Sequence, residues 1–211
     1  MWVAVVAALI LAAPGPADEK ANVVAGLQAW LDGTQTLDMR FQQSLVSSAL
    51  GTTATEKGRM YLERPGKLRW DYLDPERKIA LLLGDQTALY LEEDKLMSRG
   101  RLTGEQGLFP RLLAGNGRVD ELFIGTLMAT PFTGGRGSYR LRLVPKGEFQ
   151  SLGVVILTLR PPSFILEGAE LLDETGNRTT YTFSSLRRNQ GLPEGIFAFE
   201  PPPGTELVDE R

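Results

Sequence analysis

The sequence predicts a mainly β protein in which one curved antiparallel sheet is covered by a few helices. Apolar residues recur at every second position through most of the chain, whereas helical spacing is confined to residues 20–31 and 104–130. With 211 residues and 42% hydrophobic residues, the chain has room for one core. A large antiparallel sheet needs cover for its apolar face, and the helical stretches are the elements left to supply it. The residues therefore indicate a single domain, a barrel-like sheet closed by a helical lid.

The start of the chain is typical of an export signal. Residues Trp2–Ala13 form an uncharged apolar run, too short to span a bilayer but suited to the hydrophobic region of a signal peptide. Small residues precede Asp18 at the positions that a signal peptidase requires, although the usual basic residues at the start are missing. The alternative, a buried N-terminal helix, fits poorly with the two prolines that follow the run. We expect residues 1–17 to be a signal peptide and residues 18–211 to be the folded domain.

The first element of that domain is predicted to be an amphipathic helix over residues 20–31. Val23, Leu27, Trp30 and Leu31 recur there at steps of three and four residues.

Strands are predicted to follow, because the apolar period changes to two. In the third of them Lys67, Arg69 and Asp71 alternate with apolar residues, as expected for a sheet with one face in water. Two further strands are predicted on either side of a turn at Gly84, and another is predicted after the acidic residues 92–94. Because the strands follow one another closely in the chain, a meander is the simplest topology. The apolar face of the first three strands is predicted to carry Met39, Phe41 and Leu45, then Met60 and Leu62, then Leu68, Trp70 and Tyr72.

The alternation of apolar and polar residues stops between Gly104 and Thr130. We predict two short helices there, joined by a hinge at residues 115–117. The first carries Leu108 and Leu112 at helical spacing, and the second carries Val119, Leu122, Phe123 and Leu127.

Alternation returns after the helices and predicts strands at residues 138–146, 152–160, 165–173 and 178–186. A last short strand is expected at the start of IFAFEPPPGTELV, stopped by the three prolines. The predicted total is about ten or eleven strands.

Composition excludes several classes of function. The chain has no histidine and no cysteine, so it holds no Ser-His or Cys-His nucleophile pair and few donors for zinc. Its acidic clusters fall at predicted turns, and there is no phosphate-binding P-loop motif. The net charge of −3 and the lack of a basic cluster argue against nucleic-acid binding. We expect no catalytic residues, no metal and no cofactor.

Four segments resemble the periplasmic outer-membrane lipoprotein carrier family, which is called LolA-like. They are RFQQ near the first strand, GRMYLERPGKLRWDYLDP, DETGNRTTYTF and the ending FAFEPPPGTELVD. The resemblance covers nearly all of the chain after the predicted signal peptide.

The resemblance implies an unclosed β-barrel of about eleven strands, covered by helices that enclose an apolar cavity. It also implies a periplasmic chaperone that binds the acyl chains of lipoproteins released by an inner-membrane ABC transporter and delivers them to an outer-membrane acceptor. The acceptor of this system is anchored through a lipidated cysteine, so the absence of cysteine favours the carrier. We expect a monomer without a cofactor.

By the same resemblance, Arg64 matches an arginine that hydrogen-bonds the lid backbone and holds the cavity shut, and Leu68 and Trp70 match cavity-wall positions. A guanidinium fork suits helix-end carbonyls, whereas the alternative is a solvated arginine at a strand end. For the apolar residues, the sequence alone leaves an ordinary packed core open as the alternative. The predicted acyl-chain cavity is lined by Phe41, Met60, Leu62, Leu68, Trp70, Tyr72, Leu108, Phe109, Leu112, Phe123 and Leu127.

Two other functions fit the same residues. One is a carrier of another lipid, such as a glycolipid. The other is a sensor of lipids or lipoproteins with a similar lidded-barrel shape, which would need a further partner-binding domain.

Overall fold

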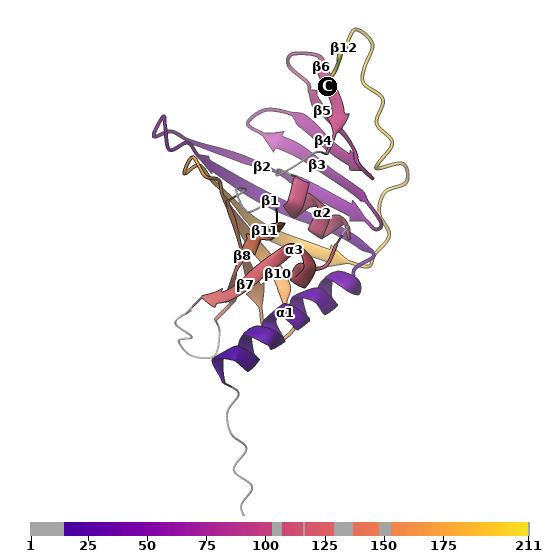
Figure 1. Cartoon of the computed structure of the whole chain (residues 1–211). Coiled ribbons are helices and arrows are strands. Elements are labelled where there is room, and N and C mark those ends of the chain that lie inside the picture. Colours follow the sequence, from indigo (N-terminus) through magenta and orange to yellow (C-terminus); the bar gives the residue numbers. More distant parts are fainter. Residues whose placement is uncertain (1–14, 103–106, 116, 129–136, 148–152, 211) are drawn as a thin grey trace, which may run out of the picture.

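The computed structural model describes residues 15–102, 107–115, 117–128, 137–147 and 153–210. These residues form one twelve-stranded sheet in the order β12-β6-β5-β4-β3-β2-β1-β11-β10-β9-β8-β7, with the helices on its concave side (Figure 1). The elements are α1 (Pro16–Asp32), β1 (Thr36–Val46), β2 (Thr53–Glu63), β3 (Lys67–Asp74), β4 (Lys78–Leu83), β5 (Gln86–Leu91), β6 (Leu96–Arg101), α2 (Leu108–Ala114), α3 (Val119–Leu122), β7 (Phe123–Met128), β8 (Tyr139–Pro145), β9 (Val154–Arg160), β10 (Ile165–Leu172), β11 (Arg178–Arg188) and β12 (Glu206–Asp209).

The sheet consists of two antiparallel meanders joined side by side. Strands β1 to β6 pair in chain order, strands β7 to β11 do the same, and β1 pairs with β11 to join them. The edge strands β7 and β12 stand apart in Figure 1, so the barrel is unclosed, as predicted. The connection between the meanders, from β6 to β7, carries α2 and α3 across the concave face.

Helix α1 covers the β7–β8 end of the sheet. Its predicted apolar face is confirmed: Val23, Leu27, Trp30 and Leu31 are all at most 5% exposed. The helix begins at Pro16, four residues earlier than predicted, with an acidic first turn that complements the positive end of the helix dipole.

One apolar cluster fills the concave side between the sheet and the helices. It takes side chains from both meanders and from all the described helices, and its strand members alternate with polar residues that face outward. Side chains with 0% exposure lie in both meanders: Met39, Met60 and Leu68 in the first, and Leu141, Leu143 and Leu159 in the second. Burying a side chain of this size contributes about 2 kcal/mol.

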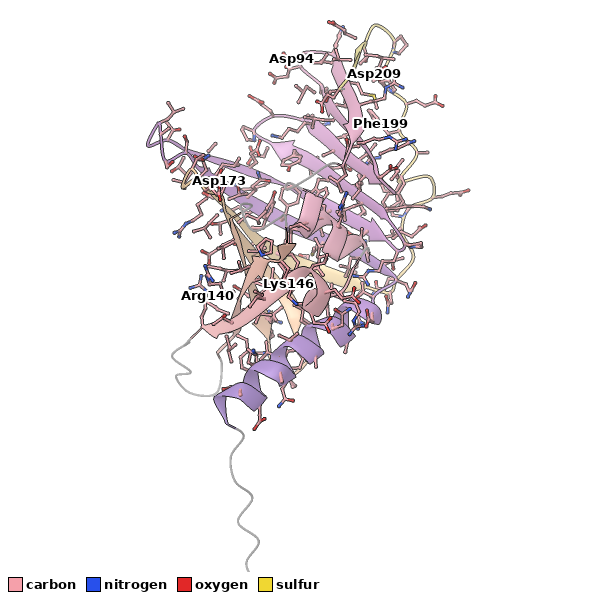
Figure 2. The ribbon with its side chains drawn as sticks, in the orientation of Figure 1. Asp94, Arg140, Lys146, Asp173, Phe199 and Asp209 are labelled. Carbon is pink, nitrogen blue, oxygen red and sulfur yellow. The ribbon has the colours of Figure 1, made fainter. Side chains whose placement is uncertain are left out.

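A second, smaller apolar group lies on the outer face of the sheet beneath the C-terminal segment. Tyr90 and Met97 are 5% and 6% exposed, and the ring of Phe199, labelled in Figure 2, lies 5.2 Å from that of Tyr90. The guanidinium of Arg69 donates to the carbonyl of Ile196 at 2.7 Å and so fastens this segment. Residues 196–199 therefore cover part of the outer face of the sheet.

The prediction of a second lid helix carrying Phe123 and Leu127 is wrong. Helix α3 ends at Leu122, and both residues lie on strand β7, which pairs with β8. Residues four apart share a face in a helix and also in a strand, so the spacing alone did not distinguish them. The pairing partner β8 decides in favour of the strand.

The strand predicted at the start of IFAFEPPPGTELV is also wrong. Residues 196–199 lie on the outer face, and the strand comes after the prolines as β12, parallel to β6. Prolines have no N–H to give to a ladder, so pairing resumes only beyond the turn at Gly204. The described sheet thus has twelve strands instead of about eleven.

The predicted signal peptide at residues 1–17 falls almost entirely outside the described residues and remains a prediction. No helix in the described ranges is long and apolar enough to cross a membrane.

The outer face of the central strands holds a buried carboxylate. The side chain of Asp38 on β1 is 4% exposed, and Arg59 donates to its two oxygens at 2.6 Å each. Arg187 on β11 donates to it as well. Burial would raise the pKa of Asp38, but the hydrogen bonds from both arginines outweigh it and hold that pKa below the ordinary value of 3.8. This contact ties β2 and β11 to β1 and so joins the two meanders.

We expect Asp38→Asn to lower the free energy of unfolding by about 2 kcal/mol near neutral pH, because an amide cannot accept from two arginines. A pKa lowered by folding stabilises the protein above the unfolded-state value, and this contribution is lost as the pH falls through the folded-state value. The difference between wild type and variant should therefore shrink below a pH of about 4. Urea unfolding of wild type and variant at neutral and acid pH measures this difference in the free energy of unfolding.

Asp74→Asn is the matched control, since the Asp74 side chain is 62% exposed and lies 3.4 Å from Lys57. It should change stability by less than about 0.5 kcal/mol. An Asp38→Asn effect that stays constant down to acid pH would contradict the assignment.

Candidate functional site: a fastened helix over an apolar cluster

The candidate site lies where α2 covers strands β2 and β3. This helix is apolar on most of its surface, and Pro110 and Arg111 are its partly exposed residues. Its buried residues are Leu108, Phe109, Leu112, Leu113 and Ala114.

Arg64, at the end of β2, fastens the C-terminal end of this helix. Its Nε donates to the carbonyl of Leu113 at 3.0 Å, and its Nη2 donates to the carbonyl of Leu112 at 3.2 Å. The N–H of Gly66 donates to the carbonyl of Ala114 at 3.0 Å. The last carbonyls of a helix have no partner within it and form the negative end of its dipole, so they suit a cation.

Gly115 ends the helix and makes room for the arginine. Its φ of +87° is left-handed, and its N–H caps carbonyls of the last turn. A Cβ atom there would lie 3.2 Å from Cδ and Nε of Arg64. Glycine is therefore required twice, for the backbone conformation and for the approach of the guanidinium.

The charge of Arg64 is partly withdrawn from water. Burial lowers the pKa of the guanidinium from its ordinary value, while Asp32 acts weakly in the opposite direction. The group stays protonated, because arginine titrates far above physiological pH. Its partners on α2 are neutral carbonyls, so the desolvation of the charge offsets part of the gain from the hydrogen bonds.

The predicted cavity residues come together in one place. Every one of them belongs to the concave cluster or packs against it, and the register sets Met60 opposite Trp70 and Leu62 opposite Leu68. Phe41, Met60, Leu62, Leu68, Leu108, Phe109, Leu112 and Phe123 are buried, and Trp70, Tyr72 and Leu127 are half-buried.

Sequence reasoning missed the opposite wall of the cluster. Leu141, Leu157 and Leu159 are at most 1% exposed, and Phe183 lies opposite Phe41 across the β1–β11 pair. Alternation placed these residues on strands, but only the join between β1 and β11 shows that the second meander faces the same helices as the first.

Aromatic side chains connect α2 to the sheet at the end away from Arg64. The ring of Phe109 stacks on that of Tyr181 with centroids 6.3 Å apart. Phe41 meets Tyr72 edge to face at 5.0 Å, and its ring lies over Gly58, where a Cβ atom would be only 2.7 Å from Cζ of Phe41. Adaptable aromatic surfaces of this kind suit the binding of hydrocarbon chains.

Comparison with known proteins assigns the chain to a family. The sequence profile described as outer membrane lipoprotein carrier protein LolA matches residues 32–200. An outer-membrane lipoprotein carrier protein from Chromobacterium violaceum is 31% identical over 205 residues, which cover 95% of this chain and 94% of that one. The chain belongs to the outer-membrane lipoprotein carrier family. Another family member, from Methylococcus capsulatus, is 30% identical over 186 residues, with 88% of this chain and 86% of the relative covered.

The fold of this family member is also found in distant solved structures. A conserved protein from Thermus thermophilus superposes with a TM-score of 0.54, covering 91% of this chain and 99% of its own, at 12% identity. A likeness at so low an identity concerns the fold alone.

No group of three or more acidic side chains in the described ranges is placed to hold a metal ion.

Gly115→Ala should cost about 2 kcal/mol of stability, because it adds the strain of a left-handed alanine and displaces Arg64. Gly51→Ala is the matched control: its φ of +63° imposes similar strain, and nothing lies within 4 Å of the added Cβ. The extra loss of stability that Gly115→Ala shows relative to Gly51→Ala should disappear when Arg64 is also changed to alanine. Urea unfolding of the single and double variants measures this coupling. Equal costs at the two glycines would show that the guanidinium approach is unimportant.

Proposed function

We propose that this family member is a periplasmic carrier that binds the acyl chains of lipoproteins released from an inner-membrane ABC transporter and delivers them to an outer-membrane acceptor. The observation that carries the proposal is a buried helix fastened by Arg64 over a continuous apolar cluster. The curated relatives are named as lipoprotein carriers. The role is transport without catalysis, by a monomer that needs no cofactor.

The free-energy cost of exposing acyl chains to water explains why a carrier needs a covered apolar site. Each methylene removed from water contributes about 0.8 kcal/mol, so two acyl chains resist exposure to water by roughly 20 kcal/mol. Cargo of this kind must be shielded throughout its passage between membranes. The energy for extraction then comes from the transporter, since the sequence contains no P-loop nucleotide motif.

The fastening of α2 suits a lid that opens reversibly. Three hydrogen bonds from Arg64 and Gly66 hold its C-terminal end, and each contributes about 1 kcal/mol net. These bonds are only part of the cost of opening, because moving α2 away from the sheet also exposes its large buried apolar side chains, at about 2 kcal/mol each. Cargo chains that take the place of those side chains against the sheet would supply this part by differential binding. A carrier with such a lid holds its load securely and can still release it to an acceptor that binds more tightly.

Native mass spectrometry of the protein purified from the periplasm without detergent tests the cargo directly. We expect a bound triacylated protein. A mass increase that corresponds to phospholipid or glycolipid alone would identify a carrier of another lipid instead. An empty protein that also fails to keep an added triacylated lipoprotein in solution would contradict the carrier role.

We expect Arg64→Leu to leave the fold intact while raising the open fraction of α2 by about 10- to 100-fold, because two hydrogen bonds are lost. Hydrogen exchange at residues 108–115 measures opening, and transfer of a lipoprotein from carrier to acceptor vesicles measures function. Transfer should be impaired.

Arg101→Leu is the control, since Arg101 is 72% exposed and its ion pair with Asp85, at 3.0 Å, lies on the surface. It should leave exchange and transfer unchanged. If Arg64→Leu shows the same hydrogen exchange and the same lipoprotein transfer as wild type, the arginine does not control the lid.

A further inference from the structure

The concave face carries a group of polar residues beside the apolar cluster, and we call this group the polar row. Its members come from five neighbouring strands. Gln43 on β1 lies opposite Glu56 on β2 and Tyr181 on β11, and Tyr72 on β3 lies opposite Lys78 on β4.

The side chains of the polar row interact mostly with one another. Tyr72 Oη donates to Gln43 Oε1 at 3.0 Å, and Tyr181 lies opposite Gln43 across the β1–β11 pair. Lys78 Nζ bonds Glu56 Oε1 and lies 4.4 Å from the ring centroid of Tyr72. Burial raises the pKa of Tyr181 to about 12 and that of Tyr72 further, so both hydroxyls stay protonated.

The Gln43 amide nitrogen is the exception. Within the described ranges, no acceptor is paired with its two hydrogens, although the residue is only 5% exposed. The nitrogen is not cut off from solvent, since Trp30 Nε1 is the one buried side-chain polar atom without a partner in the described ranges. The amide hydrogens therefore stay available to a ligand that brings an oxygen acceptor in place of water.

The row adjoins the proposed acyl site. Phe41 contacts Tyr72, and Phe109 of α2 stacks on Tyr181. Hydrocarbon chains that lie among these rings would bring the groups at their head close to Gln43. Those groups in acylated lipids are ester or amide carbonyls, which are neutral acceptors. An ionised fatty acid suits the place less well, because Lys78, the cation of the row, is already paired with the carboxylate of Glu56.

We propose that the Gln43 amide, held by Tyr72, donates to the ester or amide carbonyls at which the acyl chains of a lipid join its head. This contact fixes how far the chains enter the apolar cluster. The inference rests on the proposed function, since it names the part of the cargo that the same site recognises.

The test compares a diacylglyceryl lipopeptide with its dialkyl ether analogue, which has the same chains without ester carbonyls. Wild-type protein should bind the ester about tenfold more tightly than the ether, as expected for one or two buried hydrogen bonds. Gln43→Met keeps the length of the side chain without its donors and should reduce this preference to about twofold or less.

Gln42→Met is the matched control, because Gln42 is the exposed neighbour on the other face of β1. It should retain the full preference. The double variant Gln43→Met/Tyr72→Phe also removes the hydroxyl that the single variant leaves without its amide partner, and thermal unfolding verifies that each variant is folded. Tenfold selectivity that persists in both Gln43 variants would overturn the inference.

Other outcomes separate the inference from the carrier proposal. Equal affinity of wild type for ester and ether overturns the inference and leaves the carrier role standing. Binding of neither probe overturns both. A diester phospholipid that binds as tightly as the lipopeptide, with the same dependence on Gln43, supports carbonyl recognition and contradicts lipoprotein as the specific cargo.

Discussion

The concave face of the sheet must be covered, and the rest of the structure follows from this constraint. A sheet with free edges at β7 and β12 does not bury its apolar face against itself as a closed barrel does. The helices therefore complete the core, with α1 over β7 and β8 and α2 over β2 and β3. In a closed barrel the interior is fixed by the strands. Here part of the interior wall is a seven-residue helix, and moving that helix exposes the cluster without breaking a single strand pair.

Such a helix needs a fastening that is specific but weak, and Arg64 supplies one. Its hydrogen bonds go to carbonyls of the last turn of α2, and it shares the carbonyl of Leu112 with the N–H of Gly115. The cost of withdrawing its charge from water limits the net gain. The salt-bridged arginines around Asp38 show the contrast. There the cation meets a buried carboxylate, the contact joins the two meanders, and nothing about it favours opening.

The sequence predicted the parts of this arrangement that are local. Alternation of Leu68, Trp70 and Tyr72 with charged residues identified the inner face of β3, and the resemblance to the carrier family singled out Arg64. Spacing failed at Phe123 and Leu127, because residues four apart share a face in either a helix or a strand. Gln43 was missed for another reason. A glutamine in a strand is ordinarily solvated, and its burial depends on Tyr181, which is 138 positions away in the chain and adjacent only through the β1–β11 pairing.

The apolar cluster and its polar neighbours supply different properties of a carrier. Burial of hydrocarbon is non-directional and grows with area, so it gives affinity for any acyl chain without fixing how the chain lies. Hydrogen bonds depend on geometry and fix position at a small gain in affinity. In the proposed carrier, Arg64 would apply this to the lid and Gln43 to the cargo, at opposite ends of α2. Such a carrier would hold varied acyl chains through area alone, while the directional contacts would decide when the lid is closed and where the head of the lipid stands.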